Sequence, residues 1–113
     1  MELILIASAF KALLAVQCLH SIEELSMGFH KRWYAVKMPF WIFLFWEICF
    51  QAFWFFVLLA PSFPARETWM AFFNYLMFAN GVQHVVWAGV EKKYVPGLLT
   101  APLFFIVFFW FYL

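Results

Sequence analysis

Four long apolar runs, separated by three short breaks, constrain this sequence more than any other feature. The runs cover residues 3–25, 39–60, 68–90 and 97–113. A helix that crosses a membrane needs about 20 apolar residues at ~1.5 Å each, and the first three runs reach that length. The fourth run is shorter and contains Pro102. The chain has 113 residues and is 68% hydrophobic, which is more apolar surface than a soluble domain of this size can bury. We therefore expect lipid to surround much of it.

The short breaks predict how the runs are arranged. Helices joined by short loops run antiparallel to their neighbours in sequence. We therefore predict an all-α membrane protein, with residues 1–113 forming a single domain that is an up-down bundle of four transmembrane helices. The formal net charge of +1 gives no indication of a nucleic-acid partner. The first run has no basic segment before it, and Gln17 precedes Cys18, so we expect a retained span rather than a signal peptide or lipoprotein anchor.

Basic residues in the short loops predict the orientation in the membrane. Loops on the cytoplasmic side carry an excess of lysine and arginine. The break at 61–67 carries only Arg66, whereas the other two breaks carry most of the basic residues: Lys31, Arg32, Lys37, Lys92 and Lys93. We therefore expect an integral membrane protein with loops 26–38 and 91–96 in the cytoplasm and both termini on the exoplasmic side.

Two histidines and three glutamates lie inside the apolar runs, where charge is costly. Counted from the nearest break at ~1.5 Å per residue, His20, Glu47 and His84 all lie about 10–12 Å below the cytoplasmic face. Glu23 and Glu24 lie closer to that face. Because the spans alternate in direction, these groups share one depth, and we predict that His20 and His84 meet in one pocket.

Helical spacing predicts which polar residues share a face. At ~100° per residue, Gln17, His20, Glu23 and Glu24 fall within an arc of ~120° on the first helix. Asn80 and His84 are four residues apart and therefore lie on one face. A polar residue in a span can also form a hydrogen bond between helices. We expect this role for Gln17, Asn74 and Gln83, and it is an open alternative for Glu47.

A set of histidines and carboxylates predicts a limited chemistry. Zinc, iron and manganese accept such ligands, and we predict His20, Glu23, Glu24 and His84 as metal ligands. Helical bundles hold these metals with a histidine and a glutamate three residues apart, a spacing that His20 and Glu23 show in reversed order. The alternatives are acid–base catalysis without a metal and a path for protons or cations.

Three segments resemble the motifs of a known family. His20-Ser21-Ile22-Glu23-Glu24 resembles the signature of the HXXEE family of small, mostly bacterial membrane proteins. Asn80-Gly81-Val82-Gln83-His84 fits the family's N-x-x-x-H motif, and residues 94–101 are similar to its tyrosine–proline–glycine segment. The resemblance implies a bacterial inner-membrane location and a functional set of His20, Glu23, Glu24, Asn80 and His84. It implies no substrate, and Glu47 lies outside the motifs.

A single polar cluster near one face is a poor path for ions across ~30 Å of hydrocarbon, which leaves two functions. The first is an intramembrane enzyme that acts on a membrane lipid or lipophilic small molecule by acid–base or metal-assisted chemistry. Its catalytic residues would be Glu23, Glu24 and Glu47, with Asn80 orienting a histidine or binding substrate. The alternative is an accessory or structural subunit, as a homo-oligomer or within a larger membrane complex. In that case a histidine could ligate haem or chlorophyll magnesium.

Overall fold

The computed structural model of the protein describes residues 2–113, and α-helices are the only regular secondary structure in that range. Its helices are α1 (Leu3–Ser26), α2 (Phe29–Arg32), α3 (Phe40–Leu59), α4 (Arg66–Glu91) and α5 (Ala101–Tyr112). The all-α prediction is confirmed, and the four long helices match the four apolar runs. Two details differ. The short helix α2 lies in the first break, and the fourth run begins with a turn, so α5 starts only at Ala101.

Only two of these helices have both the length and the apolar composition of a membrane span, namely α1 and α3. Helix α4 has 26 residues but a more polar sequence, and α5 has only 12 residues. At ~1.5 Å per residue, α5 is about 18 Å long, less than the ~30 Å of a bilayer core. Length and composition therefore support two spans, α1 and α3.

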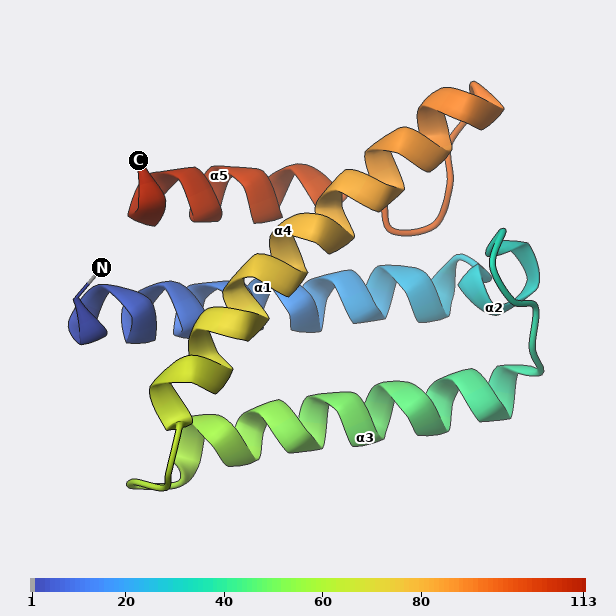
Figure 1. Cartoon of the computed structure of the whole chain (residues 1–113). Helices are drawn as coiled ribbons and strands as arrows, with labels where there is room; N and C mark the ends of the chain where they lie inside the picture. Colours follow the sequence, from blue (N-terminus) through green and yellow to red (C-terminus); the bar gives the residue numbers. More distant parts are fainter. Residues whose placement is uncertain (1) are drawn as a thin grey trace.

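The long helices alternate in direction around α1 (Figure 1). Helix α4, coloured yellow to orange, crosses α1 obliquely, and α1 also contacts α3 and α5. Both ends of the chain lie at one end of the molecule, whereas α2 and the segment 92–100 lie at the other. Residues of the first break and of the third break are thereby brought to the same end, as the alternation of short-looped helices predicts.

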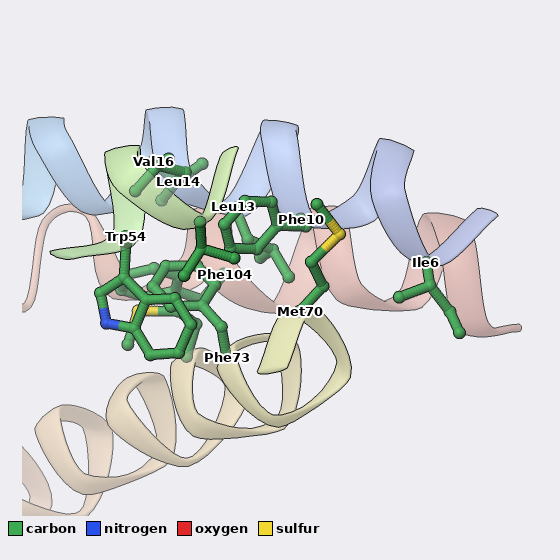
Figure 2. Packing of buried hydrophobic residues seen from close by; sticks show 11 residues of the cluster. Ile6, Phe10, Leu13, Leu14, Val16, Trp54, Met70, Phe73 and Phe104 are labelled. Carbon is green, nitrogen blue, oxygen red and sulfur yellow. The ribbon is translucent and has the colours of Figure 1, made fainter. Parts of the chain in front are cut away.

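A hydrophobic core rich in aromatic side chains, which we call the aromatic core, joins α1, α3, α4 and α5 (Figure 2). Phe10 of α1 and Trp54 of α3 pack on Phe73 of α4, with ring centroids 5.1 Å and 4.7 Å apart from it respectively. Phe104 of α5 completes this cluster. Asn74 forms the expected contact between helices, since its Nδ2 donates to the Ile6 carbonyl and to Tyr112 Oη.

Helix α3 is buried along one narrow stripe only. Its buried residues are Phe43, Glu47, Trp54 and Val57. Trp54 and Val57 belong to the aromatic core, whereas Phe43 packs on Phe29 of α2, with ring centroids 5.0 Å apart. Helix α3 is thus held at its two ends, which leaves space between its middle part and helices α1 and α4.

Candidate metal centre

Three buried side chains of α1 and α4 meet beside the aromatic core, on its side away from the termini. His20 Nε2 lies 3.0 Å from His84 Nε2, and Glu24 Oε2 lies 3.5 Å from the former and 3.3 Å from the latter. The two histidines are 0% exposed and Glu24 is 5% exposed. The structure therefore brings His20 and His84 together, as the depth count predicts. We call His20, Glu24 and His84 the His–Glu–His cluster.

The spacing of the cluster suits a metal ion. Ligand atoms placed 2.0–2.2 Å from a tetrahedral metal are about 3.3–3.6 Å from one another. The three distances in the cluster, 3.0, 3.3 and 3.5 Å, are close to that range. The three atoms lie within 4.8 Å of one another, so one ion could contact all of them. The cluster therefore has the size of three corners of a tetrahedral site.

A hydroxyl group fixes the orientation of the His20 ring. Thr100 Oγ1 lies 2.6 Å from His20 Nδ1 and donates a 2.7 Å hydrogen bond to Glu23 Oε1. The other acceptor near this hydroxyl, the Gly97 carbonyl, is farther away at 3.3 Å. Because a hydroxyl has one proton, Thr100 accepts from His20 Nδ1–H when it donates to Glu23. The lone pair of His20 then lies on Nε2, which faces the rest of the cluster.

Glu23 binds the segment 94–100 and not the cluster. Its carboxylate accepts hydrogen bonds from Tyr94 Oη at 2.6 Å and from the backbone N–H groups of Gly97, Leu99 and Thr100 at 2.9–3.0 Å. Burial, together with the Glu23 carboxylate, raises the pKa of Tyr94, so the phenol keeps its proton and remains a donor. Glu23, predicted as a ligand and a catalytic residue, is thus placed to support the loop that orients His20.

Gly97 closes the cluster on the side of this loop. Its φ is +98°, a conformation that favours glycine. A Cβ atom at this position would overlap the rings of His84 and His20. His20 also packs edge-on against Phe104, with ring centroids 5.0 Å apart. His84 Nδ1 is buried and has no hydrogen-bond partner within residues 2–113. The cluster is therefore tightly enclosed, and the absence of a side chain at Gly97 makes room for both imidazoles.

A cavity of about 660 Å³ lies beside the cluster, between α1, α3 and α4. Its lining is mostly apolar, with a few polar side chains: Gln17, Glu24, Glu47, Asn80 and Gln83. Glu24 belongs to both the cluster and the cavity wall, so it connects the two. Glu47 Oε2 accepts a 3.0 Å hydrogen bond from the Oγ of Ser21, a residue about one helical turn before Glu24 on α1.

Comparison with known proteins identifies the family. A family model described as "Protein of unknown function with HXXEE motif" matches residues 11–112. The chain belongs to the HXXEE family. No curated protein and no solved structure matches this HXXEE chain.

The residues of the HXXEE motif lie in different surroundings. His20 and Glu24 face His84, whereas Glu23 faces the segment 94–100. Asn80 Oδ1 accepts a hydrogen bond from Gln83 Nε2 and forms none with a histidine, so the role predicted for it of orienting a histidine belongs to Thr100. Asn80 lines the cavity, as does Glu47, which the motifs did not include.

Sequence reasoning missed Thr100 and Gly97 as site residues. Both lie in the segment 94–101, which carried the third resemblance to the HXXEE family. A threonine at the start of an apolar run and a glycine after a proline were the available signals. Neither signal indicates contact with His20, because Thr100 and His20 are 80 positions apart in the chain.

Proposed function

We propose that the protein is a small integral membrane enzyme with a divalent metal ion, which is zinc, iron or manganese, at His20, Glu24 and His84. Its substrate is a lipophilic molecule that occupies the adjacent cavity. The observation that carries this proposal is the set of three donor atoms, 3.0–3.5 Å apart and buried, on the wall of a cavity lined mostly by apolar side chains.

The ligand set supports a catalytic rather than a structural metal. Two imidazoles and one carboxylate provide three protein ligands, and catalytic sites typically keep the fourth position open. These donors suit zinc, iron and manganese. Thr100 hydrogen-bonds both Glu23 and His20 Nδ1. Hydrogen bonds of this kind, made by residues behind the ligands, typically orient a metal-bound histidine.

The cavity supports a role for the remaining polar residues. A bound ion supplies a Lewis acid that polarises a carbonyl or hydroxyl group. Glu47 faces the cavity beside Glu24 and would carry the proton that such a reaction moves. Asn80 would hydrogen-bond the substrate. These groups suit an isomerisation or a hydrolysis.

Metal content tests the proposal. Purified wild-type protein is expected to hold about one ion per chain, because the three ligands form one site. The His20→Ala and His84→Ala variants should lose the ion, whereas His30→Ala, which removes the third histidine of the chain, should keep it. Elemental analysis in mild detergent gives the result. Absence of metal from the wild type, with normal folding of both variants, would favour the accessory subunit instead.

The hydroxyl of Thr100 is expected to affect the affinity for the metal. Thr100→Val keeps the shape of the side chain but removes the group between Glu23 and His20. Loss of such an outer contact typically weakens metal binding ~10–100-fold. Thr100→Ser should restore the affinity. Competition with a chromophoric chelator measures it, and equal affinities of Thr100→Val and the wild type would refute the role of this hydroxyl.

We propose further that the four apolar runs cross a bacterial inner membrane, with both termini exoplasmic. The fourth run crosses as α5 together with the turn at residues 97–100 that precedes it. Supporting this, the termini share one end of the molecule (Figure 1), and loops 26–38 and 91–96 carry five of the seven basic residues. Alkaline phosphatase fused to either terminus should be active, and a fluorescent protein that folds only in the cytoplasm should stay dark there. A cytoplasmic signal from either terminus would contradict this orientation.

A further inference from the structure

We infer that the cavity binds an uncharged lipophile whose hydroxyl group donates a hydrogen bond to Gln17. This inference rests on the proposed function, because it takes the metal centre at the His–Glu–His cluster as the site that the rest of the ligand reaches. It narrows the substrate from any lipophilic molecule to a neutral one with a hydroxyl, and it excludes fatty acids, phospholipids and cationic amphiphiles.

The charges around the cavity exclude an anionic ligand. Two carboxylates, those of Glu24 and Glu47, line it, and no lysine or arginine in residues 2–113 does. An anionic headgroup placed beside Gln17 would have no lysine or arginine to pair with, and the ion of the cluster would lie about 10 Å away along α1. Charge is costly to bury in such an apolar setting.

The same charges leave no place for a cationic ligand. The Glu24 carboxylate faces the two histidines, and Glu47 accepts the hydrogen bond from Ser21. A cationic headgroup therefore gains no unpaired carboxylate. A neutral ligand fits this arrangement best.

An unpaired side chain indicates the kind of polar group. Gln17 is 3% exposed and lines the cavity, and its Oε1 has no hydrogen-bond partner within the described chain. A buried polar atom normally has a partner, so this oxygen requires a donor from whatever fills the cavity. A hydroxyl group supplies a donor without adding charge.

The position of Gln17 suits a substrate that reaches the metal centre. Gln17, Ser21 and Glu24 are spaced four and three residues apart, so they lie on one face of α1. Gln17 lies about 10 Å along the helix from Glu24, and the Ser21–Glu47 hydrogen bond lies between them. A ligand whose hydroxyl binds Gln17 thus extends past Glu47 to the cluster. The cavity volume of about 660 Å³ accommodates one such molecule.

Photolabelling with matched probes tests this inference. The probes are hexadecyl compounds that carry the same diazirine and end in a hydroxyl, a methyl ether, a carboxylate or a trimethylammonium group. The alcohol should label cavity residues such as Trp46, Phe50 and Met77 several-fold more than the other probes. Gln17→Leu should reduce labelling by the alcohol several-fold and leave labelling by the methyl ether unchanged. Mass spectrometry locates the adducts.

Three results would overturn the inference. They are equal labelling by the alcohol and the methyl ether, preferred labelling by a charged probe, and alcohol adducts confined to exposed residues such as Trp41 and Trp110. The metal content of the same samples separates this test from that of the proposed function. Metal without preference for the alcohol overturns only the ligand assignment, whereas labelling that depends on Gln17 in protein without metal supports it and overturns the metal centre.

Discussion

The Gly97→Ala variant is expected to lose its metal and to unfold at a lower temperature than the wild type. A Cβ atom at this position would overlap the rings of His84 and His20, which are packed and cannot withdraw. The backbone φ of +98° adds a cost of about 1–3 kcal/mol for a residue other than glycine. Thermal unfolding and elemental analysis of the same preparation measure both effects.

Gly89→Ala is the matched control for this variant. Gly89 lies inside α4, and a Cβ there would meet nothing within 4 Å. Alanine is the better helix former by about 0.5–1 kcal/mol in a helix interior, so this variant should keep the metal and be as stable as the wild type or slightly more so. If Gly97→Ala kept its metal as Gly89→Ala does, the enclosure of the cluster by the segment 94–100 would be wrong.

Substitution of the two adjacent glutamates is expected to affect different properties: stability for Glu23 and metal content for Glu24. Glu23→Ala leaves the backbone N–H groups of Gly97, Leu99 and Thr100 without their acceptor, and the loss at the buried Gly97 N–H alone costs about 1–3 kcal/mol. This variant should therefore be less stable by several kcal/mol. Glu24→Gln should remain folded and lose the metal, because it removes a charged ligand without changing the size of the side chain.

Glu67→Ala serves as the control for loss of a carboxylate, since Glu67 is exposed at the start of α4. It should change neither the stability nor the metal content. Denaturant unfolding in detergent and elemental analysis distinguish the variants. Equal stability of Glu23→Ala and Glu24→Gln would show that Glu23 does not hold the segment 94–100.

The meeting of His20 and His84 could be predicted from sequence because it depends on two regular quantities. Helices rise by a constant amount per residue, and short loops make successive helices alternate in direction. Counting from the breaks therefore placed both histidines at one depth. The depth of Glu47 followed from the same count, and its side chain lines the cavity beside Glu24.

The division of roles between Glu23 and Glu24 could not be predicted in the same way. The two residues are ~100° apart around α1, so both fit within the polar arc that faces the interior. Which of them faces His84 depends on how α4 crosses α1 and on where the segment 94–100 lies. The sequence also predicted a fourth helix from residue 97, whereas α5 begins at Ala101, because residues 97–100 form a turn that binds Glu23.

X-ray absorption at the edge of the bound metal tests the metal centre most directly. The account predicts a first shell with two imidazole nitrogens and carboxylate oxygen at about 2.0–2.2 Å, with imidazole scattering that is lost in His84→Ala. A wild-type protein that retains no ion, or an ion whose spectrum shows no imidazole, would contradict it.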